Sequence, residues 1–216
     1  MLKLIIGNKA YSSWSMRGWL AVKQSGLPFE EITVPMFDED WHKRREDDEF
    51  APSAGKVPIL WDEQTVVWDS LAIIEYLADR TDRARFWPDD LAARAMARSM
   101  AAEMHSSFEN LRREHSMNLR HRFPQRELSE AVVAEVKRIL ELWAEARARH
   151  GGGGPYLFGD FGAVDIMFAP VVTRFVTYQI PVPRFALAYM EAILHHPWML
   201  EWIEAAQEEP WVIERY

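Results

Sequence analysis

The fold is decided by residues 55–77, which read GKVPILWDEQTVVWDSLAIIEYL. Two short segments rich in β-branched and aromatic residues, 57–61 and 65–68, are separated by a connection of hairpin length. Asp-Ser then precedes an apolar pattern at helical spacing over 71–77. This stretch therefore predicts a strand, a second strand antiparallel to it, and a helix.

A complementary unit lies upstream of this stretch. Residues 2–6 and 30–34 are rich in Leu, Ile or Val, which predicts two strands. The segment 15–25 between them predicts a helix, because Gly26 followed by Pro28 is a helix stop signal. A strand, a helix and a strand form a βαβ unit, so the combined order is βαβ followed by ββα.

From about residue 90 onward the sequence has apolar positions at helical spacing. The expected helices span 91–113, 127–149, 161–176, 184–194 and 197–206. A run of four glycines, 151–154, predicts a flexible break. We therefore expect an α/β domain over residues 1–80 and an all-helical domain over residues 90–216.

Residues 38–49 form a run of mixed charge. Such a run predicts a solvated helix or loop over the sheet edge. A less favoured alternative is that one of its basic residues meets a ligand carboxylate.

The composition excludes several classes of function. The 216-residue chain has 33 acidic and 25 basic residues, and its net charge of −8 argues against a nucleic-acid partner. It has no cysteine, which excludes disulfides, thiolate metal sites and thiol nucleophiles. Its histidines show no metal-ligand spacing, so we expect no metal. No apolar run approaches the ~18 residues of a membrane span, and none at the N-terminus is long enough for a signal peptide, so we expect a cytoplasmic protein without membrane contact.

The turn between the first strand and the first helix carries three serine hydroxyls within Tyr11-Ser12-Ser13-Trp14-Ser15. The first turn of a helix offers unpaired N–H groups and the positive end of the helix dipole, so an anion can be held there. The alternative is that one of these serines merely caps the helix.

Two further motifs follow along the chain. A proline at position 58 is tolerated at the start of a strand, and a cis Val57–Pro58 bond would expose the backbone of Val57 to a partner. The alternative is an ordinary trans proline on an edge strand. Asp69 and Ser70 are expected helix caps, but they can also hold the ammonium and carboxylate of one amino-acid end of a ligand.

These motifs, in this order and followed by a helical half, resemble the cytosolic glutathione transferase superfamily over essentially the whole chain. The βαβ–ββα half is similar to its thioredoxin-like domain. The serine turn is most similar to the zeta-class pattern Ser-Ser-Cys-Ser-Trp-Arg, with the theta class next. Trp14 replaces the zeta cysteine, which argues against zeta-type isomerase activity. Asp69 replaces the commoner Glu, and Gly162 stands where the family has a Ser or Thr cap.

The resemblance implies that glutathione is the co-substrate and that a serine hydrogen-bonds its sulfur. The zeta pattern points to Ser12, whereas counting back from Arg17, as in the theta pattern, points to Ser13. Both therefore remain candidates.

The resemblance also implies how the rest of glutathione is bound. Val57, beside a cis Pro58, would bind its cysteinyl backbone, and Lys56 would approach its glycine carboxylate. Asp69 and Ser70 would take its γ-glutamyl end. The electrophile pocket should lie between the domains, with the candidate wall residues Tyr11, Trp14, Met104, His105 and Phe108. For Met104 and Phe108 the alternative is a place in the helix core.

The implied function is conjugation of glutathione to small electrophiles by a cytoplasmic, homodimeric detoxification enzyme. Two enzymatic alternatives are a zeta-like cis–trans isomerase of the maleylacetoacetate type and a glutathione-dependent dehalogenase. A non-enzymatic alternative is a binding or assembly module with the same fold. That alternative predicts loss of the ligand-anchoring residues, which this chain retains.

Overall fold

The computed structural model describes residues 1–213. Its single sheet contains β1 (Leu2–Ile6), β2 (Phe29–Thr33), β3 (Ile59–Asp62) and β4 (Thr65–Val67). The strand order is β2-β1-β3-β4, with β1 parallel to β2 and the other pairs antiparallel. The predicted thioredoxin-like βαβ–ββα order is thereby confirmed. β3 begins two residues later than predicted, since Pro58 has no N–H to donate to a sheet.

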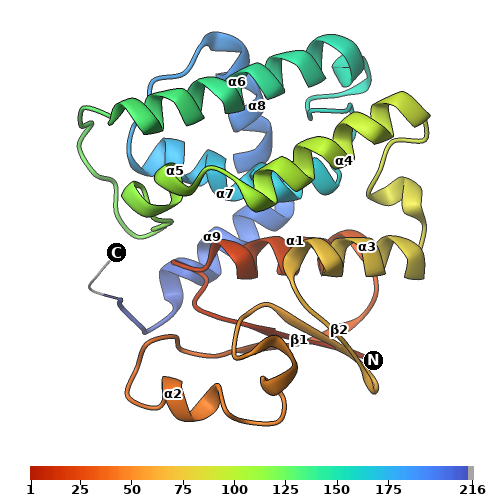
Figure 1. The fold of residues 1–216 in the computed structure, drawn as a ribbon, viewed down its shortest axis with the longest axis vertical. Coiled ribbons are helices and arrows are strands. Elements are labelled where there is room, and N and C mark those ends of the chain that lie inside the picture. Colours follow the sequence, from red (N-terminus) through yellow and green to blue (C-terminus); the bar gives the residue numbers. More distant parts are fainter. Residues whose placement is uncertain (214–216) are drawn as a thin grey trace.

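Helices cover both faces of this sheet. α1 (Ser13–Ser25) and α3 (Ser70–Arg80) pack side by side on the face toward the helical part, and the short α2 (Trp41–Arg44) lies beyond the other face (Figure 1). Two short 3₁₀ turns, Ala51–Ser53 and Arg83–Arg85, complete this part of the chain.

Six helices follow in the described residues: α4 (Leu91–Ser106), α5 (Glu109–Glu114), α6 (Glu130–His150), α7 (Ala163–Thr177), α8 (Arg184–Leu194) and α9 (Pro197–Glu208). Helices α4 to α8 form the upper part of the molecule in Figure 1, and α9 lies lower, beside α1. A third 3₁₀ turn, Gly151–Gly153, begins the glycine run. Arg147 donates to the carbonyls of Gly151 and Gly154, so this run is held against α6.

The predicted helix over 91–113 is interrupted. Phe108 takes the left-handed conformation, with φ of 64°, and separates α4 from α5. The first N–H groups of α5 have lost the helical carbonyls that a continuous helix would supply. Glu135 of α6 accepts hydrogen bonds from the amides of Asn110 and Leu111 instead, at 3.1 and 2.7 Å. A residue distant in sequence thus stabilises the break.

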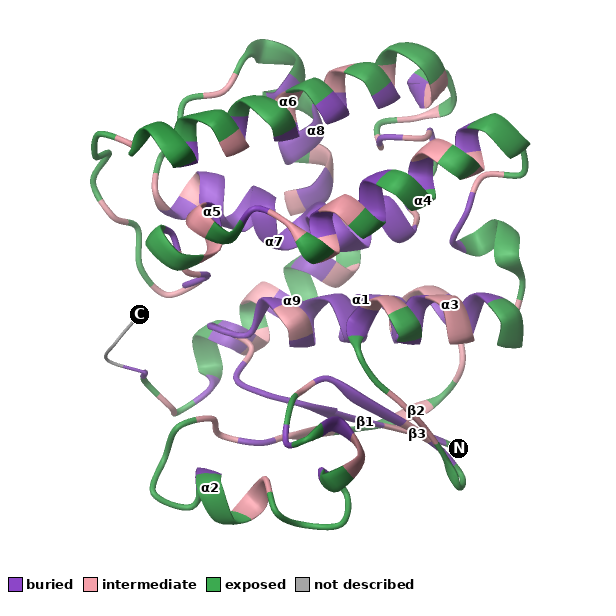
Figure 2. Cartoon of the chain, in the orientation of Figure 1, coloured by how far each residue is buried: buried purple, intermediate pink, exposed green. Residues whose placement is uncertain are grey.

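α7 lies at the centre of the core and is buried along almost its whole length (Figure 2). It packs against α4 and α1, so one continuous core joins the helices to the sheet. At its start the amide of Gly162 donates to the carboxylate of Asp165 at 3.0 Å, which is the half of a capping box that a glycine cap permits. α7 therefore fixes the position of α1 relative to the helical part.

Candidate active site

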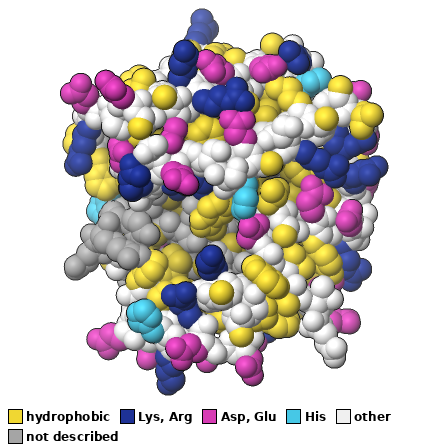
Figure 3. Space-filling model, in the orientation of Figure 1, with side chains coloured by type: hydrophobic (Ala, Val, Ile, Leu, Met, Phe, Trp, Pro, Cys, Tyr) yellow, Lys and Arg dark blue, Asp and Glu magenta, His cyan; other side chains and the backbone are white. Residues whose placement is uncertain are grey.

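A cavity of about 870 Å³ lies between the α/β part and the helices. In Figure 3 it is visible as a hollow with hydrophobic side chains around it and basic side chains on its lower side. The start of α1 forms its centre. Residues that precede β3 and residues at the start of α3 line one side. Residues from α4, α5 and α7 line the other.

Ser12 is the N-cap of α1. Its Oγ accepts a hydrogen bond from the amide of Ser15 at 3.2 Å and donates to Ser15 Oγ at 2.8 Å. Ser15 Oγ in turn accepts from the amide of Gly7 at 2.9 Å. The expected capping role therefore belongs to Ser12, whose hydroxyl is engaged with the turn itself.

Ser13 is the first residue of α1 and has a different environment. Its Oγ accepts a hydrogen bond from Nη2 of Arg174, on α7, at 3.2 Å. Within residues 1–213, no acceptor for the Ser13 hydroxyl proton is found. The hydroxyl can therefore donate that proton to a group in the cavity.

The Val57–Pro58 peptide bond is cis. Val57 precedes the first paired residue of β3, and its N–H and C=O have no partner in the part of the chain that the structure describes. Val57 lines the cavity. An extended peptide could therefore pair with this residue as a further strand would.

Asp69 and Ser70 lie at the start of α3, as predicted. Asp69 Oδ1 caps the helix by accepting from the amides of Leu71 and Ala72 at 3.0 and 3.4 Å. Its Oδ2 lies 3.0 Å from Nε2 of His105, on α4. Ser70 Oγ is buried and unpaired among the described residues, although it lines the cavity. An unsatisfied buried hydroxyl at the first turn of a helix suits a ligand carboxylate.

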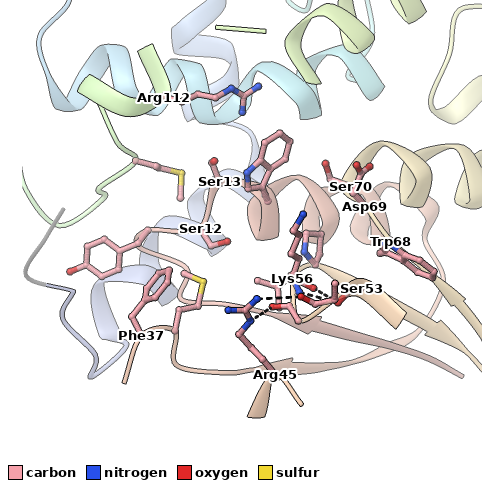
Figure 4. Close-up of a pocket in the computed structure, with 18 of the residues that line it drawn as sticks. Ser12, Ser13, Phe37, Arg45, Ser53, Lys56, Trp68, Asp69, Ser70 and Arg112 are labelled. Carbon is pink, nitrogen blue, oxygen red and sulfur yellow. Dashed lines mark hydrogen bonds between the residues drawn. The ribbon is translucent and has the colours of Figure 1, made fainter. Parts of the chain in front are cut away.

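Lys56 lies across the cavity from Arg112, together with Arg45 and Ser53 (Figure 4). Arg45 donates to the carbonyls of Gly55 and Ala54, at 3.1 and 3.3 Å, and so orders the turn before Val57. Arg45 belongs to the charged run 38–49, in which the less favoured alternative had placed a base that meets a ligand carboxylate. The structure brings that base to the cavity.

Trp14 links the serine turn to the helical part. Its ring contacts His105 edge to face, with ring centres 5.4 Å apart. The guanidinium carbons of Arg17 and Arg112 each lie 4.6 Å from the centre of the Trp14 ring, within the range of cation–π interactions. The place of the zeta-class cysteine is thus taken by an aromatic surface in contact with two cations.

Most of the predicted site residues meet at the cavity. Those lining it are Tyr11, Ser12, Ser13, Trp14, Lys56, Val57, Pro58, Asp69, Ser70 and His105. Met104 and Phe108 do not line it. They are 1% and 5% exposed and belong to the core, because the break after α4 turns their side chains among the packed helices.

Several cavity residues were not predicted. They include Met36, Phe37, Trp68, Arg112, Ser116, Met117 and Arg174. Helical periodicity gave no signal for the two arginines, because charged residues on a helix are usually solvated. Within residues 1–213, no group of three or more His, Asp or Glu side chains could hold a metal ion, and no helix is long and apolar enough to cross a membrane.

Comparison with known proteins gives a consistent result. Residues 11–80 match the glutathione S-transferase N-terminal domain and residues 126–205 match the C-terminal domain. The chain is 28% identical to glutathione S-transferase GstB of Escherichia coli (strain K12) over 166 residues, which are 74% of this chain and 80% of that protein.

Solved structures share the fold. A glutathione transferase homologue from Burkholderia GL BGR1, with bound glutathione, is 24% identical and has a TM-score of 0.71 over 96% of this chain and 99% of its own. A maleyl pyruvate isomerase, described as a bacterial zeta-class glutathione S-transferase, is 21% identical and has a TM-score of 0.69 over the same shares of the two chains. Both domain matches and the shared architecture agree, and the chain belongs to the cytosolic glutathione transferase superfamily.

Proposed function

We propose that this glutathione transferase conjugates glutathione to small electrophiles and that Ser13 is the residue that hydrogen-bonds the sulfur. The observation that carries this choice is the 3.2 Å hydrogen bond from Arg174 to Ser13 Oγ. A hydroxyl that accepts from a cation is polarised and becomes a stronger donor. Ser12 instead uses its hydroxyl to cap α1.

The chemistry required of Ser13 is modest. The thiolate, not the thiol, is the nucleophile, and a free thiol is only a few per cent ionised at neutral pH. A hydrogen bond to a charged group contributes roughly 1.5–3 kcal/mol. At about 1.36 kcal/mol per pKa unit, this lowers the pKa of the bound thiol by about one to two units. Ser13 stays neutral and acts as a donor, not as a base.

The remaining groups of glutathione have matching partners in the same cavity. The unpaired Ser70 Oγ suits the γ-glutamyl carboxylate, and Asp69 suits its ammonium. Val57 offers its backbone to the cysteinyl residue, and Lys56 and Arg45 suit the glycine carboxylate. We further propose that residues 1–80 form the glutathione-binding domain, that residues 90–216 form the all-helical domain, and that the protein is a cytoplasmic homodimer that detoxifies electrophiles.

The test compares Ser13→Ala with Ser12→Ala, two substitutions that remove the same hydroxyl one residue apart. The pKa of the bound thiol is measured by thiolate ultraviolet absorbance as a function of pH. We expect Ser13→Ala to raise this pKa by about one to two units, and Ser12→Ala to lower thermal stability with little effect on it. The reverse pattern would assign the sulfur to Ser12. Calorimetry that detects no glutathione binding at millimolar concentration would overturn the proposal and favour a non-catalytic module.

A further inference from the structure

Two arginines, Arg112 and Arg174, line the helical side of the cavity, and a third, Arg17 of α1, lies next to them against the Trp14 ring. Arg17 is fully buried; its Nε donates to the carbonyl of Met167 at 2.9 Å, but its Nη1 and Nη2 have no partner among the described residues. Arg112 donates from Nε to the carbonyl of Ser107 at 3.0 Å. Its Nη1 is buried and has no hydrogen-bond partner among the described residues. Arg174 bonds Ser13, as described above.

Arg17 and Arg112 form no ion pair with a carboxylate among the described residues. The charges of Glu135 and Glu109 act on Arg112 from a distance, and Glu135 is already bonded to the start of α5. Burial lowers the pKa of Arg112 to about 10, and burial together with Arg112 and Arg174 lowers the pKa of Arg17.

Both shifts have one physical cause. Desolvated like charges are unfavourable unless an anion or other partner compensates them. The Trp14 ring compensates only in part, because a cation–π contact is much weaker than a full ion pair in a buried site. A bound anion next to the unpaired Nη1 of Arg112 would supply the missing charge.

The position of this cluster separates it from the groups that suit glutathione. Arg112 enters the cavity from the helical side near Ser13, whereas Lys56 and Arg45 lie on the opposite side (Figure 4). An anion at Arg112 would therefore lie beside the place where the sulfur reacts. Trp14, which also lines the cavity, offers apolar surface next to Arg112 for the apolar body of the same molecule.

We propose that the electrophile of this site is an organic anion, an aromatic or unsaturated carboxylate whose charged group binds Arg112 while its apolar body packs on Trp14. This inference rests on the proposed conjugation. With a chloroarene carboxylate, the thiol proton goes to solvent, the thiolate sulfur forms a C–S bond at the carbon that bears chlorine, and chloride leaves with the electron pair of the C–Cl bond. Arg17 does not line the cavity and adds positive charge 4.6 Å from the centre of the Trp14 ring.

The experiment uses two electrophiles of the same shape, 4-chloro-3-nitrobenzoate and the neutral 4-chloro-3-nitrobenzamide. For each, kcat/KM is measured with the wild type, with Arg112→Met and with the control Arg113→Met. Arg113 is the adjacent arginine on α5, and its side chain is 66% exposed and paired with Glu114. We expect Arg112→Met to lower kcat/KM for the benzoate more than for the benzamide, so that the ratio of the two values falls roughly ten-fold or more. Arg113→Met should leave the ratio of the two unchanged.

Two outcomes would overturn the inference. An equal loss for both electrophiles would make Arg112 a structural residue that holds the break between α4 and α5. The second outcome needs no variant. 3-Nitrobenzoate and 3-nitrobenzamide cannot lose chloride, and the inference fails if the glutathione-loaded wild type binds both with equal affinity. Glutathione binding and the pKa of the bound thiol are measured in parallel. If both remain as proposed, only the anion preference has failed; if the wild type binds no glutathione, the proposed function has failed as well.

Discussion

His105 Nε2 lies 3.0 Å from Asp69 Oδ2, and this contact ties α4 of the helical part to the first turn of α3. The other oxygen of Asp69 caps α3, so both oxygens of the carboxylate are oriented before a ligand arrives. His105 also contacts Trp14. One histidine therefore connects the residue proposed to bind the γ-glutamyl ammonium with the turn that carries the serines.

Replacing His105 should weaken glutathione binding more than it slows turnover. His105→Ala removes the polar contact that orients Asp69, so we expect KM for glutathione to rise by about two- to ten-fold with little change in kcat. His105→Gln, which retains an N–H donor, should recover part of the loss. The exposed His42 on α2 provides the control, as His42→Ala. A change in kcat alone would contradict a role in positioning Asp69.

Ser70→Ala should separate affinity from stability. The hydroxyl of Ser70 is buried without a partner among the described residues, so its removal breaks no hydrogen bond of the protein. We expect thermal stability to stay the same or rise, whereas the Kd for glutathione from calorimetry should increase roughly ten-fold or more. Ser99→Ala, which removes an exposed hydroxyl bonded within α4, is the matched control. Lower stability with unchanged glutathione affinity would refute the assignment of Ser70 to the ligand.

Arg45 should recognise the charge of the glycine carboxylate. Arg45→Ala removes a cation from the cavity wall and also two hydrogen bonds that order the turn at Ala54 and Gly55. A glutathione analogue with the glycine carboxylate converted to an amide separates these effects. We expect the variant to lose affinity for glutathione by about two- to ten-fold more than for the amide. Lys43→Ala, which removes an exposed charge on α2, is the control. Equal losses of affinity for both ligands would show that Arg45 only orders the turn and does not recognise the carboxylate.

Asp165 should make stability depend on pH. Burial raises the pKa of its carboxyl from 3.8 to about 7. Between these values the folded protein retains a proton that the unfolded chain has released, so this group lowers the free energy of unfolding as pH rises through that range. Asp165→Asn removes the titration.

Urea denaturation over a pH series tests this expectation. The free energy of unfolding of the wild type minus that of Asp165→Asn should fall as pH rises from 3.8 to about 7 and then level off. Asp160→Asn, an exposed substitution nearby, is the control. If the difference in free energy of unfolding stays constant across this pH range, the pKa of the Asp165 carboxyl is not raised in the folded protein.

The sequence predicted the elements whose signals are local. Residues 2–6 and 184–194 form a strand and a helix with the expected bounds, because β-branched residues and helical periodicity act over a few neighbours. The break at Phe108 was not predicted, since the carboxylate that stabilises the start of α5 comes from Glu135 on another helix. Tertiary contacts of this kind leave no local pattern.

The same distinction applies to the site. The turn at Ser12 and Ser13 and the pair Asp69 and Ser70 were predicted to lie at a ligand, because hydroxyls and carboxylates at helix starts have a recognisable spacing, and the structure places them at the cavity. Their roles remain predictions. Arg112 was missed because its burial follows from the packing of α5, not from its neighbours in sequence.

The break between α4 and α5 has a consequence for how the substrate range of this enzyme could change, in evolution or by engineering. Arg112 reaches the cavity from a short segment whose start is bonded to Glu135 of α6, apart from the strands and helix starts proposed to bind glutathione. If the anion proposal holds, we expect mutations in that segment to change which electrophiles are accepted while glutathione binding is retained. Libraries for new substrates should therefore vary residues 107–114 first and keep Glu135 constant.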